Sequence, residues 1–285
     1  MFIPDIPSII KNQLPDLYDL DPLAHGGQKS VFRAKHMVYQ DVVFKLLLDS
    51  DERTQREIEV ATQYQFSNVP KVYESGTISF AGAQSSYLLE AYVQGETLRT
   101  CLSRGKVPLS TNLNLIRTLL TISTETEKRQ LVHRDIKPEN IILGSDGNIW
   151  LIDFGIARHL SKASITATGA RFGPCTVGYA APEQFRNMKS DIDIRADLFS
   201  IGVVAYESFT GQNPFKTGAR DDLDVLRRTE SLVLKPLNIQ GDTSNELSQF
   251  ISTLIDKYPS RRPRTAQQAL NWFIDLLPTI KNGNI

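Results

Sequence analysis

Two short stretches carry side chains suited to phosphate, metal and proton chemistry. The first, LVHRDIKPENIIL at residues 131–143, sets its polar groups between two apolar runs, at His133, Arg134, Asp135, Lys137 and Asn140. A carboxylate such as Asp135 can accept a proton, and an ammonium such as Lys137 can neutralise phosphate charge. The second stretch is Asp153-Phe154-Gly155, thirteen residues after Asn140. A solvated turn is the alternative interpretation of the first stretch taken alone.

The segment that separates the two stretches predicts how they meet. IILGSDGNIWLI is typical of a β-hairpin with Asp146-Gly147 at its turn. A tight hairpin brings Asn140 and Asp153 to the same end of a two-stranded ribbon. An amide oxygen and a carboxylate are hard ligands that suit Mg²⁺. We therefore expect a magnesium site beside Asp135.

The first half of the chain alternates β-like runs with turns. Four runs are rich in Val, Phe, Tyr and Leu, and one charged segment at 51–66 favours a helix. The economical interpretation is a five-stranded sheet with one helix. The β-like runs lie at 23–34, 41–48, 71–78 and 85–93.

From Gly95 onward the apolar pattern is helical. In LSTNLNLIRTLLTI, which begins at Leu109, apolar residues recur on one helical face, and Ser110 or Thr111 would be the N-cap. A second helical face ends near Gly211, which suits a left-handed C-terminal glycine. A third runs over 266–277 and ends before a proline. The pattern predicts a β-rich half, a hinge near 91–95 and a helical half.

Composition excludes several classes of protein. The 285 residues carry 32 basic and 32 acidic side chains, so no global field favours nucleic acid or an anionic membrane. The two cysteines, Cys101 and Cys175, lie far apart, which suits a reducing compartment. The N-terminus is a poor signal peptide, and no run reaches the length of a membrane span. We expect a cytoplasmic protein with no nucleic-acid or membrane partner.

Taken together, these motifs resemble those of the protein kinase family, specifically the bacterial Ser/Thr kinases of eukaryotic (Hanks) type. HRDIKPEN matches the catalytic-loop pattern of that family, and DFG follows at the usual distance. The resemblance implies an α+β, two-lobed protein kinase fold with a small β-rich N-lobe and a larger helical C-lobe. Its expected parts are an extension at 1–17, a kinase domain at 18–277 (N-lobe 18–90, hinge 91–95, C-lobe 96–277) and a tail at 278–285.

The resemblance also implies roles for particular residues. Asp135 would accept the proton of the substrate hydroxyl, and Lys137 would balance charge on the transferred γ-phosphoryl group. The Mg²⁺ ligands would be Asn140 and Asp153. Lys45, in DVVFKLL, matches the lysine that binds the α- and β-phosphates of ATP. Its ion-pair partner on the next helix would be Glu57, with Glu52 and Glu59 as the alternatives.

The nucleotide loop departs from the family pattern G-x-G-x-x-G-x-V. Only the second glycine and the valine remain, and side chains stand at Ala24 and Lys29 in place of glycines. We expect ATP to contact this loop, with a weaker affinity than is usual in the family. The loop residues expected to contact ATP are Ala24, Gly26, Gly27 and Val31.

The hinge also departs from the family. Alignment places Glu90 at the gatekeeper position with Ala91 next to it. A buried carboxylate there needs a partner, or else the alignment shifts by one residue.

CTVGYAAPEQ, at residues 175–184, resembles the end of an activation segment. Thr176 would hydrogen-bond near Asp135 and Lys137, and the glutamate of the Ala-Pro-Glu motif would pair with an arginine. An aspartate on a later helix, Asp197, would brace the catalytic loop, as the resemblance implies. These structural residues are Glu183 with Arg262 (or the adjacent Arg261), and Asp197.

Kinases with an arginine before the catalytic aspartate commonly depend on a phosphorylated activation loop. Here that arginine is Arg134, and a T-x-T pair precedes the TVGY segment. We expect phosphate at Thr166 or Thr168 to dock on Arg134 and order the segment.

The resemblance implies an ATP- and Mg²⁺-dependent protein Ser/Thr kinase, with Mn²⁺ as a substitute metal. It would phosphorylate Ser and Thr of proteins and itself in trans, through a transient homodimer. One alternative is a pseudokinase scaffold, supported only by the altered glycine loop. The other is a small-molecule phosphotransferase of similar fold, which has no need of a peptide-docking segment such as TVGYAAPE.

Overall fold

The computed structural model describes residues 6–25, 29–48, 52–105, 107–153, 158–159, 175–186, 188 and 192–281. Within these ranges, the side chains of residues 25, 52–54, 56–57 and 158–159 are not described. The chain divides into two compact units. Unit 1 comprises residues 1–65 and 69–94, and unit 2 comprises residues 66–68 and 95–285.

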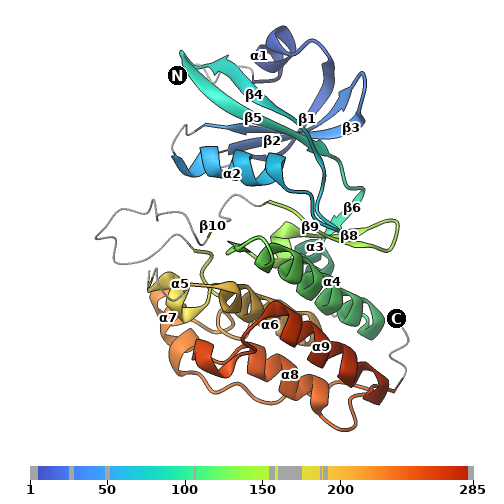
Figure 1. Ribbon diagram of the computed structural model, residues 1–285, viewed down its shortest axis with the longest axis vertical. Coiled ribbons are helices and arrows are strands. Elements are labelled where there is room, and N and C mark those ends of the chain that lie inside the picture. The colour runs from blue at the N-terminus through green and yellow to red at the C-terminus, as the bar shows by residue number, and fades with distance from the viewer. Residues whose placement is uncertain are drawn as a thin grey trace. The chain divides into compact units, whose positions relative to one another are not determined.

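Unit 1 is built on a five-stranded antiparallel sheet in the order β1-β2-β3-β5-β4 (Figure 1). Alternate residues of its central strands, such as Phe32, Phe44 and Leu46, are buried in one core. Strand β3 is buried on both faces near its end, where Lys45 lies between the buried Phe44 and Leu46. The strands are β1 (Leu17–His25), β2 (Lys29–His36), β3 (Gln40–Leu47), β4 (Val72–Phe80) and β5 (Ala83–Ala91).

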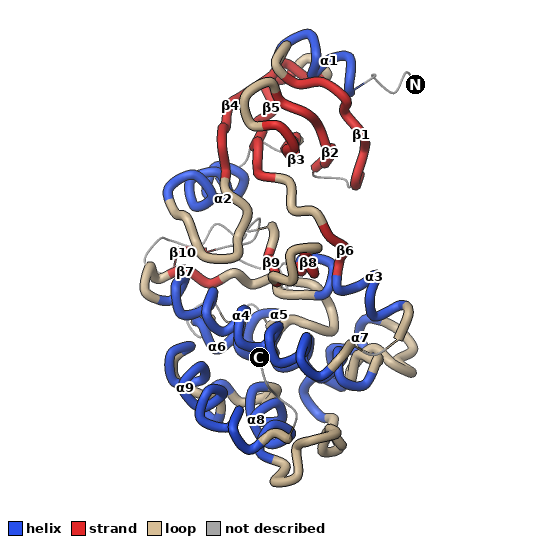
Figure 2. The backbone as a smooth tube through the Cα atoms, turned by 90° about the vertical axis from the view of Figure 1, so that its right-hand side faces the viewer, coloured by secondary structure: helices blue, strands red, loops and turns tan. Residues whose placement is uncertain are grey.

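Two helices accompany this sheet, α1 (Ile6–Gln13) and α2 (Glu52–Gln63). Helix α1 adds Ile10, which is fully buried, to the same core. Its last residue, Gln13, accepts a hydrogen bond from the Ser79 N–H and donates one to the Ser79 carbonyl, each at 2.8 Å. Because β4 lies at the edge of the described sheet, this amide pairs with backbone groups of Ser79 that point away from β5. Figure 2 shows α1 at one end of the sheet.

The sequence predicts a single helix for this half of the chain, and α1 is the helix that it misses. Eight residues make only about two turns, which is too short for a periodic apolar pattern to stand out. Helix α1 is stabilised by packing of Ile10 rather than by its own propensity.

Unit 2 is mainly helical. The long helix α6 (Ile194–Thr210) is buried over most of its surface, which suits the uninterrupted run of apolar residues and glycine at 201–205 in its middle. Gly202 of α6 permits close packing, because a Cβ there would lie 2.7 Å from the Ile255 side chain and 2.8 Å from that of Leu254. The other α-helices described are α3 (Leu98–Ser103), α4 (Leu109–Glu127), α5 (Pro182–Phe185), α7 (Asp222–Ser231), α8 (Glu246–Leu254) and α9 (Ala266–Leu276).

Short strands hold the loops of unit 2. Strands β6 (Gly95–Thr97), β8 (Ile141–Gly144) and β9 (Ile149–Leu151) form one small sheet, and β7 (Leu131–Val132) pairs with β10 (Arg158–His159). The β8–β9 hairpin is the one that the sequence predicts. Its turn contains Gly147 at φ 82°, a left-handed conformation that suits glycine.

The ends of the helices test two further predictions. Gly211 ends α6 in the left-handed conformation, at φ 75°, as predicted. The predicted N-cap of α4 is wrong: the helix begins at Leu109 with Pro108 as its cap, so that Ser110 and Thr111 lie in its first turn. The side chain of Pro108 has no group that could accept a capping hydrogen bond, and the helix has none. Among the described helices, none has both the length and the apolar character needed to cross a membrane.

Candidate functional site

Asp135 lies in unit 2, in the loop between β7 and the 3₁₀ turn η1 (Pro138–Asn140). Its side chain is buried, and three neighbouring groups donate to its carboxylate. Oδ2 accepts from Lys137 Nζ at 2.7 Å and from Asn140 Nδ2 at 2.9 Å. Oδ1 accepts from the Thr176 hydroxyl at 2.6 Å. The carboxylate is therefore held in one orientation by a cation, an amide and a hydroxyl.

Lys137 and Thr176 also contact each other. The Lys137 ammonium donates to the Thr176 hydroxyl oxygen at 3.0 Å, which closes a triangle with Asp135. The contact joins the loop after β7 to the segment before α5, 39 residues further along the chain. The hydrogen bond that the resemblance implies for Thr176 is therefore present.

The backbone of the loop is braced from α6. The Asp197 carboxylate accepts from the His133 N–H at 2.7 Å and from the Arg134 N–H at 2.8 Å. Arg134 adopts φ 69°, a left-handed conformation that costs free energy in a non-glycine residue. Gln184 also donates to the Arg134 carbonyl, at 2.6 Å. These contacts hold the strained residue next to Asp135, so the expectation that Asp197 braces this loop is confirmed.

Burial shifts the pKa values of two groups in this brace. Complete burial raises the pKa of Asp197 to about 6, against the effect of the two N–H groups that donate to it. Burial likewise lowers the pKa of His133 to about 4, so this imidazole is neutral near neutral pH. A neutral His133 can accept the hydrogen bond that the Asp135 N–H donates to its Nδ1, at 3.3 Å.

Asn140 and Asp153 are brought together by the β8–β9 hairpin. The Ile152 N–H, one residue before Asp153, donates to the Asn140 carbonyl at 2.8 Å. The Asn140 amide nitrogen donates to the main-chain carbonyl and the carboxylate of Asp135, which directs its Oδ1 the other way. Asp153 adopts φ 70°.

These two residues fit a Mg²⁺ ion in kind and number. An amide oxygen and a carboxylate are hard donors, and Mg²⁺ is commonly held by few protein ligands together with phosphate oxygens. No group of three or more His, Cys, Asp or Glu side chains that could enclose a metal occurs in the part of the chain that the structure describes. Two such donors suit a metal that phosphate oxygens also coordinate.

A buried ion pair joins α5 to the loop before α9. Arg262 contacts the Glu183 carboxylate through Nη1 at 2.7 Å and Nη2 at 3.1 Å, and both side chains are almost fully buried. The prediction that Arg262 pairs with Glu183 is confirmed. Arg261 instead has a largely exposed side chain and lies 3.7 Å from Asp256.

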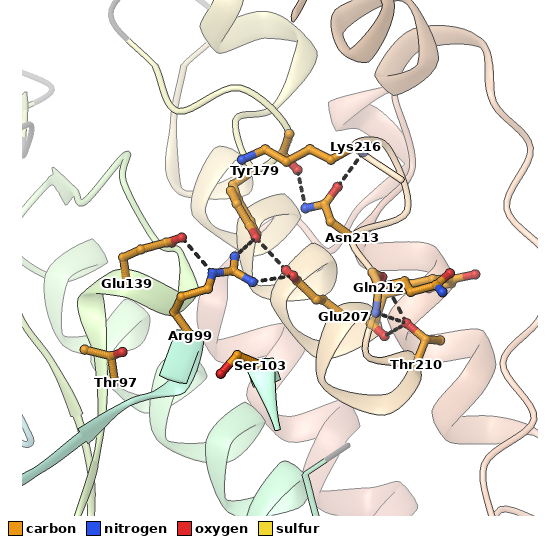
Figure 3. A network of polar contacts seen from close by, with 12 residues as sticks. Thr97, Arg99, Ser103, Glu139, Tyr179, Glu207, Thr210, Gln212, Asn213 and Lys216 are labelled. Atoms are coloured by element: carbon orange, nitrogen blue, oxygen red, sulfur yellow. Dashed lines mark hydrogen bonds and ion pairs between the residues drawn. The ribbon is translucent and has the colours of Figure 1, made fainter. Parts of the chain in front are cut away.

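A polar network that the sequence did not predict surrounds Arg99 of α3 (Figure 3). The Arg99 guanidinium donates to Glu139 at 2.8 Å, to Glu207 at 2.8 Å and to the Tyr179 hydroxyl. Tyr179 donates in turn to Glu207. Burial, followed by the charge of Glu207, raises the pKa of Tyr179, so it stays a neutral donor. The network connects η1, the segment after Thr176, and α6.

Two neighbouring residues secure the Tyr179 end of this network. Asn213 donates to the Gly178 carbonyl at 3.1 Å, and the Lys216 ammonium lies 5.0 Å from the centre of the Tyr179 ring. Glu139 and Tyr179 belong to motifs that the sequence singles out. Arg99 and Glu207 sit on ordinary helical patterns, so no local signal marked them.

Lys45 lies in unit 1, on the central strand of the sheet. Its ammonium contacts both carboxylate oxygens of Glu90 on β5, at 2.9 Å and 2.8 Å, and both residues are buried. Glu90 is the residue placed at the gatekeeper position, and the partner that its carboxylate requires is Lys45. Glu57, the expected partner, lies in α2, where its side chain is outside the described ones, as is that of the alternative Glu52.

The nucleotide-loop residues lie at the ends of β1 and β2. Ala24 pairs with Val31 across the two strands, beside a register irregularity in β1. Ala24 is not among the residues with positive φ, so alanine fits its backbone conformation. Gly26 and Gly27 lie outside the described residues, as do Thr166, Thr168 and the Phe154-Gly155 pair of the second motif.

The comparisons with known proteins agree with this geometry. The family model described as "Protein kinase domain" matches residues 20–273. The chain therefore belongs to the protein kinase family. Its β-sheet region followed by a helical region is the α+β architecture expected of that family. Members of the family use ATP and a divalent metal ion.

Among curated proteins, the chain is similar to bacterial kinases. It is 34% identical over 202 residues to the serine/threonine-protein kinase PknL of Mycobacterium tuberculosis, covering 68% of this chain and 49% of PknL. It is 29% identical over 266 residues to the serine/threonine-protein kinase PknB of Mycobacterium leprae, covering 90% of this chain and 42% of PknB. The chain thus spans less than half the length of these relatives. The similarity places it with the Hanks-type bacterial Ser/Thr kinases.

Proposed function

We propose that this chain is a protein Ser/Thr kinase that transfers the γ-phosphoryl group of ATP to Ser and Thr hydroxyls of proteins. The observation that carries the proposal is the position of the Asp135 carboxylate, held between Lys137, Asn140 and Thr176. A carboxylate in that setting can accept a hydroxyl proton while the adjacent ammonium balances phosphate charge.

In the proposed reaction, the substrate hydroxyl oxygen forms a bond to the γ-phosphorus as the bond from that phosphorus to the β–γ bridging oxygen breaks. Asp135 takes the proton of the hydroxyl, and ADP is the leaving group. Lys137, 2.7 Å from Asp135, balances the charge on the transferred group. Positioning and electrostatics supply most of the catalysis in such chemistry.

The resemblance names the residues that would take part in nucleotide binding. Lys45 would bind the α- and β-phosphates, and the facing ends of β1 and β2, with Ala24 and Val31, would contact the nucleotide. Asn140 and Asp153 would hold Mg²⁺, or Mn²⁺ in its place. When bound, such a metal neutralises charge on the phosphate oxygens.

The test of the proposed function is incubation of the purified chain with γ-labelled ATP, Mg²⁺ and a general protein substrate. We expect label on Ser and Thr residues, and loss of transfer by about a thousandfold or more in Asp135→Asn, which lacks the proton acceptor but keeps the side-chain volume. The variant should still bind MgATP. Near-wild-type transfer by Asp135→Asn would contradict the proposal.

The altered glycine loop favours a second candidate, a pseudokinase that binds partners without turnover. Ala24 and Lys29 stand where the family has glycines. This candidate predicts that the wild-type chain binds nucleotide, or a protein partner, and transfers no label. Transfer to a small molecule, and none to protein, would instead identify a small-molecule phosphotransferase.

We further propose that the chain phosphorylates itself in trans, within a transient homodimer, at Thr166 or Thr168. Two observations support this proposal: the T-x-T pair in the sequence and the burial of Arg134 next to Asp135. Thr166 and Thr168 themselves lie outside the described residues. Mass spectrometry of active protein should find phosphate there. The double variant Thr166→Ala, Thr168→Ala should lose most activity toward an added substrate, and full activity without loop phosphate would contradict the idea.

The absence of nucleic-acid and membrane partners is likewise proposed from the balanced charge of the chain, and a cytoplasmic location from its two widely separated cysteines. Fractionation of cells that express the tagged chain tests the location. Retention on heparin or on anionic vesicles at moderate salt would contradict the partner proposal.

A further inference from the structure

The pairing of Glu90 with Lys45 is set by the register of the sheet. Lys45 on β3 pairs directly with Leu88 on β5, and Val43 pairs with Glu90. Side chains two residues apart on a strand lie on the same face, so Lys45 and Glu90 are diagonal neighbours on one face. Both strands are interior in the order β1-β2-β3-β5-β4. The backbone separation of the two residues is therefore fixed by hydrogen-bonded strands.

The burial of both side chains makes the position of the Lys45 ammonium depend on its contact with Glu90. Only 6% of the Lys45 side chain and 11% of the Glu90 side chain are exposed. A cation removed from water to this extent stays charged at a fixed place only if an anion and hydrogen-bond acceptors compensate it. Glu90 supplies both, because each of its oxygens lies within hydrogen-bond distance of Nζ.

We propose that Glu90 is a positioning residue for the phosphate-binding lysine, acting from the sheet itself. This inference rests on the proposed function, in which Lys45 binds the phosphates of ATP. An ammonium has three N–H donors, so Lys45 can contact a carboxylate and a phosphate at the same time. Because β5 belongs to the same sheet as Lys45, this contact does not depend on the position of α2.

Two other roles for Glu90 make different predictions. A purely structural role would affect stability and leave the kinetics of ATP use unchanged. A competing role, in which Glu90 withholds Lys45 from phosphate, would make removal of the carboxylate tighten nucleotide binding. A positioning role predicts that the same removal weakens nucleotide binding and slows transfer.

The experiment compares Glu90→Gln with wild type by steady-state kinetics over a range of ATP concentrations, and by titration with MgADP. We expect kcat/KM for ATP to fall by about ten- to a hundredfold, with a rise in KM and a weaker Kd for MgADP. Glu90→Asp keeps the charge and retracts it by one methylene, so its loss should lie between wild type and Glu90→Gln. Because Glu90→Asp still offers Lys45 a carboxylate, the buried ammonium stays compensated and the variant should fold.

Two controls tie the effect to Lys45. Glu74→Gln removes a partly buried carboxylate from β4 of the same sheet, and it should leave KM within about twofold of wild type. In a Lys45→Met background, Glu90→Gln should change the MgADP affinity no further, because the group through which it acts is gone.

Several results would overturn the inference. These are unchanged KM and kcat in Glu90→Gln despite a lower melting temperature, tighter MgADP binding in that variant, or an equal further loss in the Lys45→Met background. A wild-type chain that binds MgADP but transfers no phosphoryl group would contradict the proposed function alone, since the binding measurements still test the role of Glu90.

Discussion

Each unit contains a buried pair of a cation and a carboxylate, and the two pairs are built differently. In unit 1, Lys45 contacts Glu90 across neighbouring strands of one sheet. In unit 2, Arg262 contacts Glu183 through two nitrogens and also donates to the main-chain carbonyls of Asp256 at 2.7 Å and Arg195 at 2.8 Å. The Arg262 guanidinium also lies 4.9 Å from the centre of the Phe199 ring.

The arginine pair is suited to supporting the fold, whereas the lysine pair is suited to binding a ligand. A guanidinium is planar, and several acceptors in its plane fix it completely. An ammonium is a compact charge on a flexible stem, which can keep one carboxylate and still turn a donor toward a phosphate. We expect loss of the arginine pair to affect mainly the stability of the fold, and loss of the lysine pair to affect mainly the binding and use of nucleotide.

The largest effect should come from removal of Arg262. Arg262→Ala leaves Glu183 as a buried, uncompensated carboxylate, which should lower the free energy of unfolding by about 3–5 kcal/mol. Urea denaturation followed by circular dichroism measures this change. Arg262→Lys keeps the charge without the planar fork, so its loss should be smaller.

The adjacent residue provides the matched control. Arg261 has a side chain that is 66% exposed, and its nearest carboxylate oxygen, on Asp256, lies 3.7 Å away. Arg261→Ala should change the free energy of unfolding by no more than about 0.5 kcal/mol. Equal destabilisation by the two alanine variants would show that Arg262 has no special place in the fold.

A smaller effect, on activity rather than stability, is expected at Thr176. Thr176→Val keeps the shape of the side chain and removes the hydroxyl that donates to Asp135 and accepts from Lys137. Loss of hydrogen bonds to charged groups should lower kcat by about ten- to a hundredfold. Thr176→Ser keeps the hydroxyl and should retain most activity. If the valine and serine variants were equally active, the hydroxyl would have no role in placing Asp135.

The catalytic loop should also respond to pH through Asp197, whose pKa is raised to about 6 by burial. Protonation turns one acceptor oxygen into a donor, so one of the hydrogen bonds from the His133 and Arg134 N–H groups is lost. We expect kcat to fall on the acid side with a midpoint near pH 6. His133, with a pKa of about 4, stays neutral through this range.

As pH falls toward 4, the contribution of Asp197 to stability should increase while activity decreases. The pKa of Asp197 is higher in the folded state than its usual value of 3.8, so the folded state binds more protons between these two values. The contribution of Asp197 to the free energy of unfolding therefore decreases as pH rises from about 4 to about 6 and is constant above. Acid inactivation near pH 6 should occur without a loss of stability from this group. An acid limb with the same midpoint in Asp197→Asn would assign it to another residue.

Sequence motifs predicted the contacts of the catalytic loop better than those of Lys45. Asp135, Lys137 and Asn140 lie within one short loop, and a hairpin of predictable length brings Asp153 near Asn140. The partners of Asp135 and Arg262 from more distant segments, Thr176 and Glu183, could be assigned only because the resemblance gave their order along the chain.

The partner of Glu90 could not be assigned from sequence, and the physical reason is register. A shift of one residue between β3 and β5 would turn Glu90 to the opposite face from Lys45. Hydrophobic alternation does not fix that register when β3 is buried on both faces. The Arg99 network was missed for a related reason, because its members come from α3, η1, the segment after Thr176 and α6, and the packing of these segments has no local signature.

The smallest predicted effect concerns the β1–β2 loop, the other nucleotide element of unit 1. Ala24 and Lys29 stand where the family has glycines, and Ala24 sits in a conformation that any residue adopts. In Ala24→Gly, Lys29→Gly, backbone N–H groups should approach phosphate oxygens more closely, and KM for ATP should fall by about two- to fivefold. The chemical step should be unchanged, because it depends on groups of unit 2.

Glycine in a strand also costs about 0.5–1 kcal/mol per residue, so a small drop in melting temperature should accompany the change. Ala24→Ser, Lys29→Ser is the matched control, since it alters both positions without adding backbone freedom, and its KM should stay near wild type. A KM that rises in the glycine variant would mean that the Lys29 ammonium itself binds phosphate. Nucleotide affinity would then depend on two lysines of the sheet, Lys29 and Lys45, rather than on a glycine loop.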